Sequence, residues 1–196
     1  KQHQNGQKEE IKLKRPIEVV NWGANTNIYR KTDEVVSSLE NEFSNIKEDF
    51  CFLFVGQWTH GSAYGDRKDI GMLVKTFLET FKGEKNKPAL ILKTSGATFS
   101  KIDKYDCLSK INKIKNDVGG DLPNVYLLHG DLDDEDINCL YNHPKVKAMV
   151  SLTKGEGYGR PLAEFCLSKK PVIASNWSGH TDFLDTNFSI LVPGTL

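Results

Sequence analysis

The sequence has no net charge and no long apolar run, and each of these absences excludes a class of protein. Lysine plus arginine and aspartate plus glutamate number 26 each among 196 residues, so no net field favours nucleic acid or an acidic membrane surface. No apolar run approaches the about 20 residues needed to span a bilayer, and no secretory signal is visible. We therefore expect no nucleic-acid partner, and membrane contact only at the periphery.

Cysteine is also scarce and is not arranged in pairs. Cys51, Cys107, Cys139 and Cys166 are scattered along the chain without a C-x-x-C spacing. This pattern predicts four reduced thiols, mostly buried in apolar segments, and a cytoplasmic protein. Disulfides or a zinc site are the alternative.

What the sequence does contain is a regular alternation of apolar strand candidates with helical periodicity. A polar, flexible arm at 1–16 precedes one domain at 17–196, which is long enough for a substantial core. Continuous apolar strands separated by helices favour a Rossmann-like α/β fold, a parallel sheet with helices on both faces. The predicted strands are 17–21, 50–56, 89–93, 124–129, 147–152, 171–175 and 188–192. The predicted helices are 33–46, 67–82, 105–118, 133–141 and 162–168, with a turn or short helix near 180.

The most informative stretch lies between the strand at 147–152 and the helix at 162–168. It reads E-G-Y-G-R-P-L-A-E, from Glu156 to Glu164. Pro161 suits the first helical position, because its missing N–H has no intrahelical partner there; this places Glu164 in the first helical turn. Free N–H groups and the helix dipole then favour an anion such as a diphosphate. A nearby carboxylate can accept hydrogen bonds from vicinal ribose hydroxyls, so the stretch indicates a nucleotide-sugar site.

These residues resemble the E-x7-E motif of retaining glycosyltransferases with the GT-B fold. The resemblance extends from about Ile17 to the end of the chain, through segments at 20–29, 52–56, 170–175 and 179–184. It implies the C-terminal, donor-binding half of a larger two-domain enzyme that transfers a hexosyl group from a nucleoside-diphosphate sugar. A saccharide, lipid or protein acceptor would bind mainly to the N-terminal half. The family works without a divalent metal, so the resemblance implies no metal and no other cofactor.

The resemblance also implies roles for the residues of the motif. Glu164 would hold the ribose hydroxyls, and Glu156 would contact the transferred sugar and support positive charge near its anomeric carbon. Gly157, Tyr158 and Gly159 would offer backbone N–H groups to the sugar and the phosphates. The structural alternatives are a capping carboxylate for Glu164, an ordinary loop acid for Glu156, and a turn that needs positive φ for the glycines.

A basic pair is implied for the diphosphate. The family pattern has a glycine and an arginine after the first strand; Gly56 matches, but Gln57 stands at the arginine position. Lys68 is assigned to the phosphates, and whether Arg67 replaces the missing arginine is open, as is a solvated helix start for both. Arg160, where aliphatic residues are common in the family, either adds phosphate charge or faces solvent.

The base is expected at the turn after the fourth predicted strand, at Gly130, Asp131 and Leu132. The family contacts the base there largely through the backbone, so the side chains give little indication of which base is bound. His129 has the character of a structural histidine, and the segment 94–96 is expected to line the mouth of the cleft.

Other functions for the same fold fit the sequence less well. No G-x-G-x-x-G follows the first strand and no P-loop occurs, which argues against a dinucleotide-dependent oxidoreductase and an NTPase. The E-x7-E stretch argues against a nucleotide-sugar epimerase. A non-catalytic nucleotide-sugar-binding or scaffolding module of the same fold stays as the alternative to the glycosyltransferase donor domain.

Overall fold

The computed structural model describes residues 15–20, 22–34, 37–59 and 61–194. Within them the chain alternates strands and helices, and six strands form one parallel sheet. The strands are β1 (Cys51–Gln57), β2 (Ala89–Ser95), β3 (Val125–Leu128), β4 (Val146–Ser151), β5 (Val172–Ser175) and β6 (Ser189–Val192). The helices are α1 (Ser37–Phe43), α2 (Ile70–Thr80), α3 (Lys101–Val118), α4 (Asp134–Asn142), α5 (Arg160–Cys166) and the 3₁₀ helix η1 (Gly179–Asp182). The predicted fold class is confirmed.

The strand order decides where a ligand can bind. The order is β3-β2-β1-β4-β5-β6, so the chain builds outward from β1 to β3 and then returns to the other side of β1 with β4. The loops after β1 and β4 leave in opposite directions, which opens a crevice at the carboxyl ends of these two strands. Any site of this fold is therefore expected between the loop after β1 and the loop that leads into α5.

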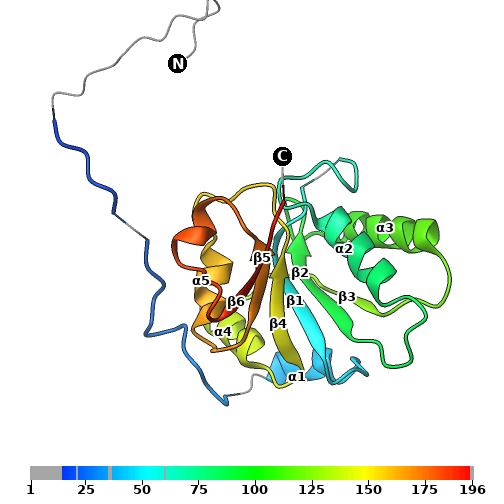
Figure 1. Cartoon of the computed structure of the whole chain (residues 1–196). Helices are drawn as coiled ribbons and strands as arrows, with labels where there is room; N and C mark the ends of the chain where they lie inside the picture. Colours follow the sequence, from blue (N-terminus) through cyan, green and yellow to red (C-terminus); the bar gives the residue numbers. More distant parts are fainter. Residues whose placement is uncertain (1–14, 21, 35–36, 60, 195–196) are drawn as a thin grey trace, which may run out of the picture.

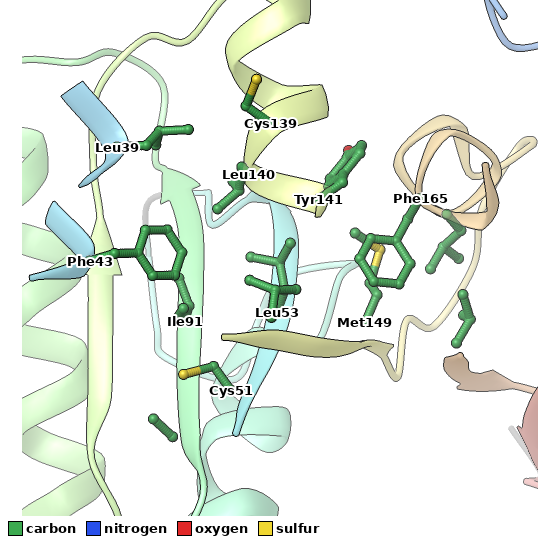
Figure 2. Packing of buried hydrophobic residues seen from close by; sticks show 14 of the residues in the cluster. Leu39, Phe43, Cys51, Leu53, Ile91, Cys139, Leu140, Tyr141, Met149 and Phe165 are labelled. Atoms are coloured by element: carbon green, nitrogen blue, oxygen red, sulfur yellow. The ribbon is translucent and has the colours of Figure 1, made fainter. Parts of the chain in front are cut away.

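Each face of the sheet packs against its own helices. Figure 1 shows α2 and α3 on one face and α4 and α5 on the other. Alternate strand residues separate into the two cores: Leu53 and Ile91 belong to the cluster on the α4–α5 side, and Phe54 and Leu90 to the cluster on the α2–α3 side. In Figure 2, Met149 of β4 lies near Phe165 of α5. This alternation follows from the two-residue period of a strand.

Of two elements predicted near the N-terminus, the strand does not form in the described residues and the helix is shorter than expected. No strand forms at 17–20, where Ile17, Val19 and Val20 are largely exposed; Asn21 lies outside the described residues. The helix predicted at 33–46 is α1 alone, and positions 35–36 lie outside the described residues. Positions 1–14 of the predicted arm also lie outside them, so the arm stays a prediction.

The remaining elements form where the sequence predicted them, mostly within a few residues at each end. The thiol prediction is confirmed, because all four cysteines are free and three of them are buried. In the described part of the chain, no helix is both long and apolar enough to cross a membrane.

Candidate functional site

A cavity of about 330 Å³ lies at the carboxyl ends of β1 and β2, next to the start of α5. Three residues proposed from the sequence line it: Gly56 at the end of β1, Leu132 after β3, and Glu164 in α5. Thr94 and Ser95, two residues of the segment 94–96 that was expected at the mouth of the cleft, line it as well, whereas Gly96 does not. The other lining residues are Tyr29, Val55, Gln57, Lys93, Phe99, Asp134, Ile137, Tyr141, Arg160 and Pro161.

Glu164 is a buried carboxylate on the wall of this cavity. Glu164 is 4% exposed. Its Oε1 accepts from Nε of Arg160 at 2.8 Å, and its Oε2 accepts from the hydroxyl of Tyr141 at 3.4 Å. Burial raises the pKa of Glu164, and the positive charge of Arg160 opposes that rise. A carboxylate held in this way keeps acceptor capacity for hydroxyl groups that enter the cavity.

The start of α5 corrects the expected position of Glu164. The helix begins at Arg160, with Gly159 as its N-cap at φ 92°, so Pro161 is the second helical residue and Glu164 lies in the second turn. A first-turn capping role is therefore wrong. Arg160, for which phosphate contact and solvent exposure were both open, pairs with Glu164 from a guanidinium side chain that is 66% exposed.

Glu156, Lys68 and Arg67 form a second group of predicted site residues. Lys68 Nζ pairs with Glu156 Oε1, and Arg67 Nη1 pairs with Glu156 Oε2 at 3.1 Å. The Glu156 side chain is only 7% exposed. Both basic residues precede α2, which begins at Ile70, so the prediction that they start the helix was wrong. An added Cβ at Gly56 would be 3.5 Å from Lys68 Cε, so Gly56 adjoins both the cavity and this ion-pair group.

Backbone contacts hold the Glu156 loop in place. The Ser178 hydroxyl accepts from Glu156 N at 2.8 Å and donates to Glu156 O at 2.7 Å, and Gly179 N donates to the same carbonyl at 3.1 Å. The Tyr158 ring packs against Phe183 with centroids 4.9 Å apart. Gly159 needs its positive φ, but Gly157 does not, so the turn-geometry explanation holds only for Gly159.

The loop after β3 contributes less side-chain chemistry than its neighbours. Among the described residues β3 is the third strand in chain order rather than the fourth, because no strand forms at 17–20. Gly130 offers its carbonyl to Lys93 Nζ at 2.6 Å, whereas Asp131 is exposed and does not line the cavity. His129 is structural, since its Nε2 lies 2.9 Å from Oδ2 of the buried Asp103.

Asp103 also accepts from the backbone N–H groups of Gly96 at 2.9 Å and Ala97 at 3.2 Å. These bonds hold the loop after β2 beside the cavity. Burial acts to raise the pKa of Asp103, but the hydrogen bonds from His129 and from the two N–H groups prevail and lower it. Sequence reasoning missed Lys93 and Phe99 as site residues. The available signal was Lys93 itself, a charged residue that directly follows the apolar run of a strand.

No model of a known protein family matches this sequence, and no curated protein matches it either. Solved structures do match in fold. The C-terminal domain of a glycosyl transferase group 1 family protein (LpcC) from Francisella tularensis superposes with a TM-score of 0.63 at 16% identity, over 88% of this chain and 81% of that chain.

Two longer proteins match in the same way. Sucrose-phosphate synthase from Thermosynechococcus elongatus gives a TM-score of 0.59 at 18% identity, over 87% of this chain and 38% of that one. Alr3699/HepE from Anabaena, solved in complex with UDP and glucose, gives 0.58 at 15% identity, over 90% of this chain and 43% of that one. The chain thus has the fold of the C-terminal domain of GT-B glycosyltransferases and spans less than half of these longer proteins.

Proposed function

We propose that this chain is the donor domain of a retaining glycosyltransferase and that it binds a nucleoside-diphosphate sugar at the carboxyl ends of β1, β2 and β4. One observation carries the proposal: the buried carboxylate of Glu164 lines a cavity that adjoins, at Gly56, the ion-pair group of Lys68 and Glu156. The Glu164 carboxylate, which can accept hydrogen bonds from hydroxyl groups, therefore lies near the Lys68 cation. Both are at the point in the sheet where the strand order reverses. A ribose linked to a diphosphate requires this combination.

Different residues bind the ribose, the diphosphate, the sugar and the base of the donor. Glu164 accepts hydrogen bonds from the ribose hydroxyls, and Lys68 and Arg67 neutralise the diphosphate together with the N–H groups of Gly157, Tyr158 and Gly159. Glu156 contacts the transferred sugar and stabilises positive charge at its anomeric carbon. The backbone of Gly130, Asp131 and Leu132 lies at the base end.

The reaction proposed for the whole enzyme needs these same groups. The bond from the anomeric carbon to the leaving phosphate oxygen breaks, and the acceptor hydroxyl attacks the anomeric carbon from the same face. The leaving phosphate oxygen takes the proton of that hydroxyl, so the configuration is retained. The acceptor would bind mainly to a second domain, and no divalent metal takes part.

Calorimetric titration of the chain with UDP, GDP and ADP, and then with their sugars, tests the donor site. Glu164→Ala removes an ionised acceptor of two hydroxyl hydrogen bonds, so the dissociation constant should rise about 30-fold or more. Glu135→Ala, which removes an exposed acid from α4 outside the cavity, is the matched control and should leave the constant unchanged. Equal affinities for wild type and a folded Glu164→Ala variant would refute the assignment.

A further inference from the structure

The cavity contains a lysine that has no role in the donor contacts proposed above. Lys93 is in β2, a strand in which every residue is buried, and it is itself only 9% exposed while lining the cavity. Lysine is among the side chains least often buried, so a buried ammonium at a cavity wall calls for a specific partner. Burial lowers the pKa of Lys93, and the nearby charge of Asp131 opposes that effect.

The hydrogen bonds of Lys93 leave room for such a partner. Its Nζ donates to the Gly130 carbonyl at 2.6 Å, and within the described residues this is its one hydrogen bond. An ammonium has three donors and no acceptor, so two donors remain for a ligand. Thr94, the next residue along the strand, also lines the cavity, and its buried hydroxyl has no hydrogen-bond partner among the described residues.

Phe99 supplies an apolar surface beside this ammonium. The residue is 51% exposed although it lines the cavity, and Lys93 Nζ lies 5.5 Å from the centroid of its ring. An exposed aromatic face is the surface on which a nucleobase stacks, and such stacking accepts any base. A base stacked on the exposed part of this ring would adjoin the Lys93 ammonium, which lies over the same ring.

The position of this pair within the sheet places it at the base end of the donor. β2 and β3 lie on one side of β1, whereas β4, which leads into α5 and Glu164, lies on the other. In the proposed donor site, a ribose held by Glu164 with its diphosphate at the Lys68 group would leave its base on the β2 side of the cavity, where Lys93 and Phe99 line the wall. Leu132, which also lines the cavity, borders the base end from the loop after β3.

We propose that Lys93 and Phe99 form the base subsite, and that Lys93 selects bases with an exocyclic carbonyl oxygen over adenine. Uracil and guanine each present such an oxygen to a donor, whereas adenine has an amino group at the position of the guanine oxygen and offers only ring nitrogens as acceptors. An ammonium that faces this position has no acceptor in its own side chain for the adenine amino group. Phe99 binds the base by stacking without selecting it. The inference rests on the proposed nucleotide-sugar function and specifies its substrate class.

Calorimetric titration of the wild-type chain and of Lys93→Met, Lys93→Gln and Phe99→Ala with UDP, GDP and ADP tests this subsite. In the wild type, UDP or GDP should bind at least tenfold more tightly than ADP. Lys93→Met should weaken that preferred nucleotide at least tenfold and leave ADP unchanged. Lys93→Gln, whose amide both donates and accepts, should bind ADP more tightly than the wild type does. Phe99→Ala should weaken all three nucleotides by similar factors.

The outcomes separate this inference from the proposed function. Tightest binding of ADP, or an equal loss for all nucleotides in Lys93→Met, would overturn the role of Lys93 while leaving the donor site intact. No binding of any nucleotide to the wild type would instead remove the proposed function and this inference with it. Thermal unfolding of each variant shows that it is folded. Inorganic pyrophosphate, which has no base, should bind equally to the wild type and to Lys93→Met.

Discussion

Lys68 and Glu156 lie 88 positions apart in the sequence, and their side chains form an ion pair next to the cavity. Their side chains are 14% and 7% exposed, so neither is a free surface charge. Sequence reasoning assigned one residue to the diphosphate and the other to the sugar. The structure joins them in one ion pair, so in the proposed donor site the diphosphate would share the Lys68 ammonium with Glu156.

The first prediction concerns the strength of this pair. Lys68→Met leaves Glu156 with Arg67, whose side chain is 59% exposed, as its remaining cation, so the variant should be less stable than wild type. A double-mutant cycle with Glu156→Gln should give a coupling free energy of about 0.5–3 kcal/mol in urea unfolding. The exposed pair of Lys75 and Glu79, 3.9 Å apart on α2, is the control and should give below about 0.5 kcal/mol. Equal coupling in the two cycles would contradict the prediction.

The second prediction follows from the raised pKa of Glu164. The folded state holds the Glu164 proton more tightly than the unfolded chain does, so this group stabilises the protein fully only below its ordinary value of 4.5. That stability is lost as the pH rises from 4.5 through the folded pKa. Glu164→Gln should therefore have a higher free energy of unfolding than wild type at pH 7, and the difference should narrow toward pH 4.

The same variant should bind nucleotide more weakly than wild type at pH 7. In the wild type, affinity should fall as the pH falls through the folded pKa of Glu164, because the ionised form accepts the ribose hydroxyls. Urea unfolding and calorimetry across this pH range measure both effects. Glu135→Gln on α4 serves as the control. A Glu164→Gln variant that is less stable at pH 7 would show that the pair with Arg160 outweighs burial.

The third prediction concerns Gly179, whose backbone packs closely against the Gly157 backbone in the Glu156 loop. A Cβ added at Gly179 would lie 2.0 Å from the Gly157 carbonyl oxygen and 2.9 Å from that of Glu156, so the loop would have to move. Gly179→Ala should lower the free energy of unfolding by about 1–3 kcal/mol. Gly157→Ala meets open space without a positive φ and should stay within about 0.5 kcal/mol of wild type. Similar losses in thermal unfolding for both variants would argue against this close approach.

The fourth prediction is that nucleotide binding does not depend on a divalent metal. Among the described residues, no group of three or more histidine, cysteine, aspartate and glutamate side chains is placed to hold a metal ion. The proposed contacts to the diphosphate come from Lys68, Arg67 and backbone N–H groups instead. The UDP dissociation constant should agree within about twofold between magnesium and EDTA, a free-energy difference of about 0.4 kcal/mol. A tenfold loss of affinity in EDTA would show that a metal carries part of the diphosphate binding.

Local patterns in the sequence determined most of the fold. The first four residues of β2 are an apolar run, and α3 ends at Val118, the last residue of the helix predicted at 105–118. These features depend on neighbouring residues, because backbone propensity and periodicity act over a few positions. The described residues 17–20 of the strand predicted at 17–21 form no strand, since an apolar run becomes a strand only where a neighbouring strand pairs with it.

The sequence by itself determined that Glu156 lies in a loop between a strand and a helix and that Glu164 lies in that helix. Only the tertiary structure decided that Lys68 and Arg67 reach across from the loop before α2 to Glu156, and that Arg160 turns back to Glu164. It also placed Lys93 beside Phe99 in the cavity. These relationships arise because parallel strands bring residues distant in sequence to one edge of the sheet, and no local pattern encodes which side chains meet there.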